Sequence, residues 1–165
     1  MLTCHRRENW GEPMANIFTA VRDVVKAYED IEVVFPVHKN PLVREIAAAV
    51  FNDVPRIHLV EPLDYLPFCH VMQRSFLVLT DSGGLQEEAP ALGKPVLVLR
   101  DTTERPEAVE AGTAMLIGTE QRAVETATKL LLEDNETYAR MAQAINPYGD
   151  GYAARRIVEI IKDFI

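Results

Sequence analysis

Residues 76–99 read FLVLTDSGGLQEEAPALGKPVLVL. Two continuously apolar runs, Phe76–Thr80 and Val96–Leu99, enclose a helical pattern at Leu85–Leu92. Strands that are apolar at every position are typical of a parallel sheet covered on both faces. A strand, a helix and a second strand in this order form one crossover unit of such a sheet. This stretch therefore predicts an α/β fold.

The same alternation of strands and helices continues on both sides of this unit. Further strands are predicted at Glu32–Pro36, Ile57–Val60 and Ala114–Ile117, and Met1–Thr3 is interpreted as the end of another buried strand. Helical spacing of apolar residues predicts six more helices, at about 14–28, 42–51, 64–72, 121–133, 136–144 and 152–164. The pattern predicts a Rossmann-like parallel sheet flanked by helices.

The length of 165 residues fits a single domain. We expect the sheet and its helices at 1–145, a turn-rich elbow at 146–151 and a terminal helix at 152–165. Natural domains rarely begin within a strand. Because Met1–Thr3 has the pattern of one, we expect the sequence to be a fragment of a longer chain.

The composition excludes several classes of protein. The chain has 17 Lys and Arg residues against 25 Asp and Glu, a net charge of −8, which argues against nucleic-acid and membrane-surface partners. No apolar run approaches the roughly 18 residues of a membrane span. Cys4 and Cys69 are far apart and outside any CxxC pattern, so we predict reduced thiols and a cytoplasmic location.

Four polar loops follow the predicted strands. In sheets of this kind, ligands bind beyond the carboxyl ends of the strands. That rule selects the loops Thr3–Gly11, Val37–Asn40, Asp81–Gly84 and Arg100–Glu107. These loops are also the most polar and unusual stretches of the chain, which predicts a ligand site at this edge.

The loop Asp81–Gly84 ends a strand and opens a helix. Gly83 and Gly84 let a ligand approach the main chain closely, and a helix amino end attracts phosphate. A tight turn with Ser82 as helix cap explains the same residues equally well. No GK[ST] and no GxGxxG pattern is present, so neither a nucleotide P-loop nor a dinucleotide-binding loop is indicated.

The other loops carry charge. Arg100 and Arg105 can clamp a diphosphate, and the alternative is pairing within the loop, among Arg100, Asp101, Glu104, Arg105 and Glu107. His5 beside Arg6 and Arg7 suggests an anion site or a proton-transfer role for the imidazole. His5 and His38 have no third ligand at suitable spacing, so no metal is predicted.

Five segments together resemble the non-hydrolysing UDP-N-acetylglucosamine 2-epimerase family. They are TCHRREN at 3–9, PVHKNP at 36–41, TDSGGLQEEAP at 80–90, RDTTERPE at 100–107 and NPYGDG at 146–151. The resemblance spans the whole chain in order. It implies the GT-B architecture, in which two Rossmann-like domains enclose a nucleotide sugar, and this chain resembles the carboxyl-terminal domain. An amino-terminal domain would then be missing.

The resemblance also implies roles for individual residues. The positions that hold the UDP part of the substrate are matched by His5, Ser82, Gly83, Gly84, Glu88 and Arg105. Phe68 matches a residue at the uracil. Arg6 and His38, with His5, match a second site at which bacterial members bind an activating UDP-GlcNAc. His5 is expected near the departing UDP.

The family reaction interconverts UDP-GlcNAc and UDP-ManNAc by eliminating and re-adding UDP, which serves polysaccharide biosynthesis. The resemblance implies no cofactor and no metal. The family's acid and base carboxylates lie in the amino-terminal domain, so this chain alone is expected to bind UDP without turnover. A homodimer is expected for the full-length enzyme.

Two other functions stay open. One is the donor-binding domain of a GT-B glycosyltransferase, and the other is a UDP-sugar sensor without catalysis. The last helix is apolar for a terminal segment, with Ile157, Val158, Ile160, Ile161, Phe164 and Ile165. In GT-B proteins the final helix commonly crosses to the first domain, so here it should not be packed on its own sheet.

Overall fold

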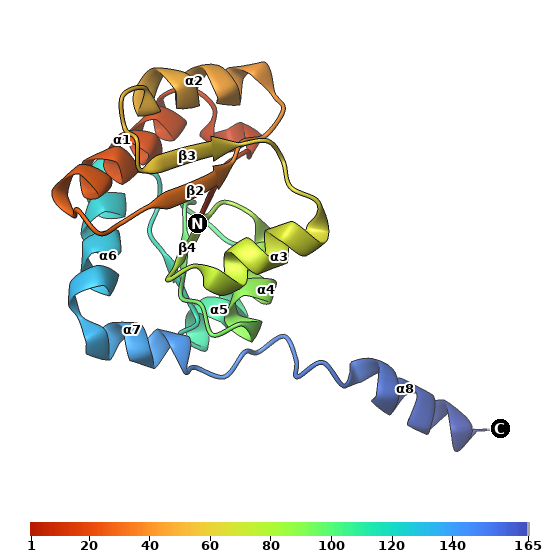
Figure 1. Ribbon diagram of the computed structural model, residues 1–165. Helices are drawn as coiled ribbons and strands as arrows, with labels where there is room; N and C mark the ends of the chain where they lie inside the picture. The colour runs from red at the N-terminus through yellow and green to blue at the C-terminus, as the bar shows by residue number, and fades with distance from the viewer. Residues whose placement is uncertain (165) are drawn as a thin grey trace.

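The computed structural model describes residues 1–164, and Ile165, with the end of the expected segment 152–165, lies outside them. A four-stranded parallel sheet has the order β1-β4-β5-β6, formed by β1 (Leu2–Thr3), β4 (Val78–Thr80), β5 (Val96–Val98) and β6 (Ala114–Leu116). A parallel pair, β2 (Val33–Pro36) and β3 (Ile57–Val60), adjoins it at β1 (Figure 1). The predicted parallel α/β sheet is confirmed.

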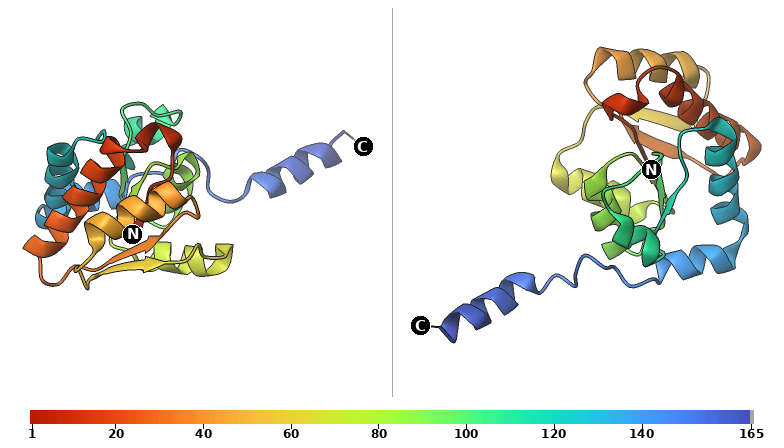
Figure 2. Two further views of the ribbon diagram at one scale, coloured as in Figure 1. Left: turned by 90° about the horizontal axis from the view of Figure 1, so that it is seen from above. Right: turned by 180° about the vertical axis from the view of Figure 1, so that it is seen from behind.

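Eight α-helices lie within residues 1–164, of which the first five connect successive strands and the last three follow β6. They are α1 (Glu12–Ala27), α2 (Pro41–Phe51), α3 (Tyr65–Arg74), α4 (Gly83–Ala91), α5 (Pro106–Glu110), α6 (Gln121–Glu133), α7 (Asn135–Ala142) and α8 (Ala153–Lys162). A short 3-10 turn, η1, covers Arg7–Asn9. Helix α1 packs against both α2 and α6. The helices α3, α4 and α5 gather on the opposite side of the strands (Figures 1 and 2).

Two apolar cores lie on the two faces of the sheet. Successive strand residues point to opposite faces. In β4, Leu79 joins the core beneath α1, α2 and α6, whereas Val78 joins the core beneath α3, α4 and α5. Leu97 and Val98 of β5 divide in the same way. This division explains why these strands are apolar at every position.

Helix α4 begins earlier than predicted. The sequence pattern places its start at Leu85, but the helix begins at Gly83, directly after Ser82 at the N-cap position. Glycine is a poor helix former, which hid the first turn from the periodicity argument. As a result, Gly83 and Gly84 are the first two residues of the helix, and their amides lie among those that lack helical partners.

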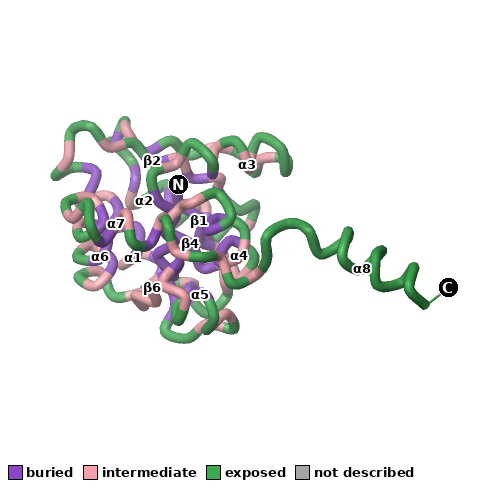
Figure 3. Tube along the Cα trace, turned by 90° about the horizontal axis from the view of Figure 1, so that it is seen from below, coloured by how far each residue is buried: buried purple, intermediate pink, exposed green. Residues whose placement is uncertain are grey.

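Helix α8 stands away from the rest of the molecule. The turn-rich segment 146–151 leads to it, and Figures 1 and 2 show it projecting into the solvent. None of its residues is buried, and Figure 3 draws its described length in the colour of exposed residues. Its apolar side chains, Ile157, Val158, Ile160 and Ile161, are each at least half exposed. The helix does not pack on its own sheet.

None of the helices within residues 1–164 combines the length and the apolar character needed to cross a membrane.

Candidate functional site

Three polar loops meet beyond the carboxyl ends of β1, β4 and β5. They are residues 4–9, residues 81–84 and residues 99–105, and side-chain hydrogen bonds join each to another. The strand order reverses between β1 and β4, because the chain runs outward to β2 and β3 on one side and to β5 and β6 on the other. Ligands of open α/β sheets bind at such a reversal. These are three of the four loops that the sequence selected.

Asp81 holds the first two loops together. It is fully buried, and its Oδ2 accepts hydrogen bonds from the main-chain N–H groups of His5 and Arg6, both at 2.8 Å. The side-chain amide of Asn9 donates to the same oxygen at 3.1 Å. Among the described atoms, Asp81 Oδ1 has no hydrogen-bond partner and lies 4.0 Å from Nε2 of His5. Asp81 therefore fixes the backbone that presents His5 and Arg6.

Neither glycine of the loop Asp81–Gly84 is required by the backbone conformation or by the packing around it. Gly83 and Gly84 are not among the residues with positive φ. A Cβ at Gly83 would meet no atom closer than Nη2 of Arg6 at 3.6 Å, and one at Gly84 none closer than Oε1 of Glu88 at 3.8 Å. Both are ordinary contacts, so the fold does not demand glycine here. Ser82 makes no side-chain cap, which removes the alternative of a turn capped by this serine.

Arg100 is committed to structural ion pairs. Its side chain is buried, its Nε donates to Glu8 at 2.6 Å, and its other nitrogens donate to Glu104. The Arg100 guanidinium lowers the pKa of Glu104 to about 2. Nη1 of Arg6 lies 3.4 Å from the same carboxylate. For Arg100 the described structure thus shows the alternative of ion pairing, and one of its partners, Glu8, lies outside the loop from which the sequence predicted the partners.

Arg105 is more accessible. Its guanidinium pairs with Glu87 of α4, and both side chains are 37% exposed. The Glu87 carboxylate raises the pKa of the Arg105 guanidinium. The side-chain amide of Asn146 donates to the main-chain oxygen of Glu87 at 3.2 Å, which ties the start of the elbow to the same helix. Arg105 is therefore a cation held by one exposed carboxylate at the rim of the site.

A second set of hydrogen bonds joins the Arg105 loop to the glycine loop. The Thr103 hydroxyl donates to Oε1 of Gln86 at 2.6 Å and accepts from the main-chain N–H of Arg105 at 3.0 Å. Nε2 of Gln86 donates to the main-chain oxygen of Ser82 at 3.2 Å. Gln86 itself is fully buried.

His5 and Cys4 belong to the first loop, and His38 follows β2. The rings of His5 and His38 lie 5.7 Å apart between centroids, which brings the end of β2 to the same edge. No group of three side chains able to hold a metal occurs within residues 1–164. Burial, followed by the charge of Asp81, raises the pKa of the Cys4 thiol well above its usual range, which disfavours the reactive thiolate.

Phe68 lies on α3, apart from these hydrogen bonds. It is half-buried and packs on the core shared by α3, α4 and α5. Tyr65 and Leu66, one turn earlier, are 72% and 67% exposed. One side of Phe68 is thus held by the core, and part of the side chain remains accessible.

Sequence reasoning did not single out Asp81, Asn9, Gln86 or Thr103. Three of them are buried polar residues, Asp81, Asn9 and Gln86, and such groups are held by hydrogen bonds in folded proteins. The available signal was position, because Asp81 directly follows a buried strand and Gln86 lies on the first turns of the next helix. Their partners are remote in sequence and could not be read from spacing.

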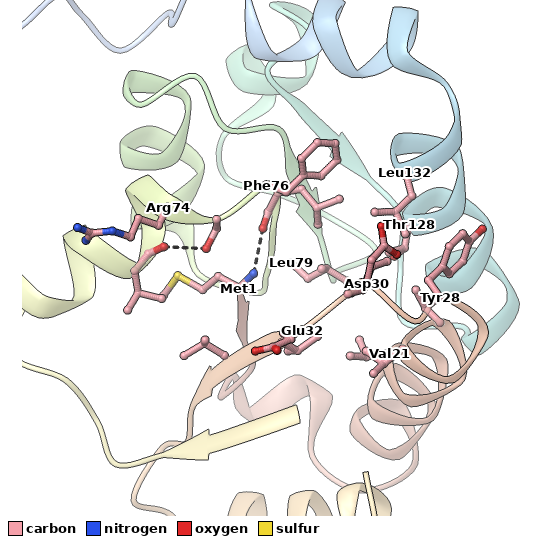
Figure 4. A pocket seen from close by; sticks show the side chains of 18 of the residues that line it. Met1, Val21, Tyr28, Asp30, Glu32, Arg74, Phe76, Leu79, Thr128 and Leu132 are labelled. Atoms are coloured by element: carbon pink, nitrogen blue, oxygen red, sulfur yellow. Dashed lines mark hydrogen bonds between the residues drawn. The ribbon is translucent and has the colours of Figure 1, made fainter. Parts of the chain in front are cut away.

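A cavity of about 650 Å³ opens at the opposite end of the strands, and Figure 4 shows it from close by. Its lining includes Met1, Val33 and Leu77 but none of the predicted site residues. The amino group of Met1 donates to the main-chain oxygen of Leu77 at 3.0 Å. Burial lowers the pKa of this group to about 5. The cavity is separate from the candidate site.

The chain matches known proteins along nearly its whole described length. The family model described as UDP-N-acetylglucosamine 2-epimerase matches residues 1–162. A UDP-N-acetylglucosamine 2-epimerase of Bacillus subtilis is 59% identical over 159 residues, which are 96% of this chain and 42% of that protein. The chain thus spans under half the length of this relative.

Solved structures give the same result. The structure of S. aureus MnaA with UDP has a TM-score of 0.94 and 53% identity, over 99% of this chain and 45% of that one. The UDP-GlcNAc 2-epimerase of Neisseria meningitidis bound to UDP-GlcNAc has a TM-score of 0.92 and 49% identity, over 98% and 44%. An E. coli heptosyltransferase with ADP, at a TM-score of 0.56 and 16% identity, shares the fold alone.

Proposed function

The chain belongs to the UDP-N-acetylglucosamine 2-epimerase family, and we propose that it forms the UDP-binding half of such an epimerase. The similar S. aureus and N. meningitidis structures hold UDP and UDP-GlcNAc. The present chain corresponds to less than half of those proteins. Catalysis then requires the remaining half.

The single observation that carries the proposal is the glycine pair at the start of α4. The fold tolerates a Cβ at both positions, and the two glycines leave the main chain open to close approach by a ligand. The free amides and the positive end of the helix dipole favour an anion. A diphosphate fits this requirement because it carries negative charge and many acceptor oxygens.

The neighbouring side chains suit the rest of the nucleotide. The Ser82 hydroxyl caps no main-chain N–H group of the helix, so it can donate to a phosphate oxygen. Arg105 supplies a cation that can exchange its partner Glu87 for a phosphate group. Glu88 is exposed one helical turn further and accepts hydrogen bonds from ribose hydroxyls. Phe68 offers a ring to pack on the uracil.

The family reaction inverts the sugar carbon that carries the N-acetyl group, through elimination and re-addition of UDP. Negative charge develops on the departing diphosphate as its bond to the sugar breaks. Donors that are fixed before the reaction stabilise such charge strongly. The amides of Gly83 and Gly84, with Arg105 and His5, would supply that stabilisation. The carboxylates that move the sugar proton would come from the other half.

The second nucleotide site of the family is proposed at the rim of the same edge. His38 and Arg6 flank His5, and the rings of His5 and His38 lie 5.7 Å apart. Arg6 is partly exposed and shares Glu104 with Arg100.

We propose that α8 packs on the other domain of the full-length protein, because its apolar face is uncovered here.

Reconstitution tests the function. Mixing this chain with the amino-terminal half of the Bacillus subtilis relative is expected to convert UDP-GlcNAc to UDP-ManNAc, followed by proton NMR of the sugar, whereas neither half alone turns over. A variant with Gly83→Ala and Gly84→Ala serves as the control, and it should support no conversion.

The other outcomes identify the rival functions. Transfer of the sugar to an acceptor, without inversion, would indicate a glycosyltransferase. A complex of the two halves that binds UDP-GlcNAc yet leaves it unchanged would indicate a sensor. Membership of the epimerase family favours inversion over both.

A further inference from the structure

The loop that carries Arg105 touches α4 at two places in the described structure. The first is the ion pair between Arg105 and Glu87, and the second is the hydrogen bond from Thr103 to Gln86. Binding of the diphosphate by Arg105, as the proposed function requires, would compete with Glu87 for the same guanidinium. The hydrogen bond between Thr103 and Gln86 uses no group that would bind the ligand, so it can join the two segments with and without UDP.

This hydrogen bond leads in both directions to the phosphate-binding groups. The Thr103 hydroxyl has one proton, which it donates to Oε1 of Gln86, so a lone pair is left for the main-chain N–H of Arg105. The other end of the Gln86 amide donates to the oxygen of Ser82, next to Gly83. One continuous path of three hydrogen bonds therefore runs from Arg105 to the glycine loop.

The burial of Gln86 fixes the orientation of its side-chain amide. Its side chain is fully buried, and both ends of its amide are occupied. A buried amide without partners is unfavourable, so the amide keeps this orientation. We propose that Thr103 and Gln86 are positioning residues that hold Arg105 in register with the amides of Gly83 and Gly84. This inference rests on the proposed UDP site.

A pair of substitutions at Thr103 isolates the hydroxyl. Thr103→Val keeps the shape and removes both hydrogen bonds, whereas Thr103→Ser keeps the hydroxyl. We expect Thr103→Val to weaken UDP binding about five- to tenfold, an effect of the size that hydrogen bonds contribute, and Thr103→Ser to bind UDP within about twofold of the native chain. Thr102→Val, at the exposed neighbouring position, is the matched control and should leave binding unchanged.

Comparison of UDP with uridine separates positioning from general loosening. Uridine has no phosphates, so its affinity, measured by NMR titration, should be the same in Thr103→Val and in the native chain. Equal losses for UDP and uridine would mean that the whole site has loosened, and would overturn the inference. Unchanged UDP affinity in Thr103→Val, or a defect that Thr103→Ser shares, would overturn it as well.

A double substitution tests the route through Gln86. Gln86→Met removes the amide at similar volume, and combined with Thr103→Val it should weaken UDP binding no more than either change alone. Additive losses would contradict a shared path. Failure of the proposed function has a different signature, because the native chain itself would then not bind UDP.

Discussion

Replacing Asp81 by alanine is expected to lower the free energy of unfolding by about 2–5 kcal/mol. The substitution removes the acceptor of the main-chain N–H groups of His5 and Arg6 and of the Asn9 amide. Each donor left without a partner costs about 1–3 kcal/mol. Asn9 keeps a second acceptor, the main-chain oxygen of Leu99, so the two main-chain groups carry most of the loss.

Urea denaturation followed by circular dichroism measures this effect. Asp81→Asn is the matched control, because its single oxygen can still accept from the two main-chain N–H groups. It should lose less than half as much stability as Asp81→Ala. If the alanine variant were as stable as the native chain, Asp81 would not be the anchor of the loop that presents His5 and Arg6.

For the isolated 165-residue chain with a free amino group at Met1, stability should also rise with pH between about pH 5 and pH 8. The Met1 ammonium has an ordinary pKa of 8.0, and burial lowers it to about 5 in the folded state. Between these values the unfolded chain binds a proton that the folded chain does not, so raising the pH favours folding. The loss of stability from burying this amine is complete below pH 5 and absent above pH 8. Three pH units correspond to at most about 4 kcal/mol.

The measurement is a series of urea denaturations across that pH range. Other groups titrate in the same interval, so a chain acetylated at its amino terminus provides the reference. The free energy of unfolding of the native chain, minus that of the acetylated chain, should rise from pH 5 to pH 8. Identical pH dependence in the two forms would contradict the buried, uncharged amine beside Leu77.

The sequence predicted the elements that depend on periodicity. The strand Ile57–Val60 and the helix Gln121–Glu133 have the predicted bounds, because each shows a clear apolar pattern between residues that end it. The glycines hid the first turn of α4, since local propensity argues against a helix at Gly83. The carboxyl edge of the sheet was predictable as a site because it follows from topology alone.

The contacts within the site were less predictable. Arg100 pairs with Glu8, which lies 92 residues earlier, and Thr103 meets Gln86 across 17 residues. Both pairs depend on how β1, β4 and β5 stand side by side, which no local pattern specifies. The loops were therefore predictable from the sequence. That Arg100 is buried in ion pairs while Arg105 stays partly exposed could be seen only in the structure.

The proposed UDP site at the amino end of α4 is the central feature of the proposed function. The direct test is a calorimetric titration of UDP into this chain, beside the variant with Gly83→Ala and Gly84→Ala. Because a Cβ fits at both positions, the variant should unfold at the same urea concentration as the native chain or higher. We expect weak but measurable binding to the native chain at millimolar UDP, and binding at least about tenfold weaker to the variant. A well-folded native chain that gives no heat with millimolar UDP, or equal affinity in the two proteins, would contradict the account.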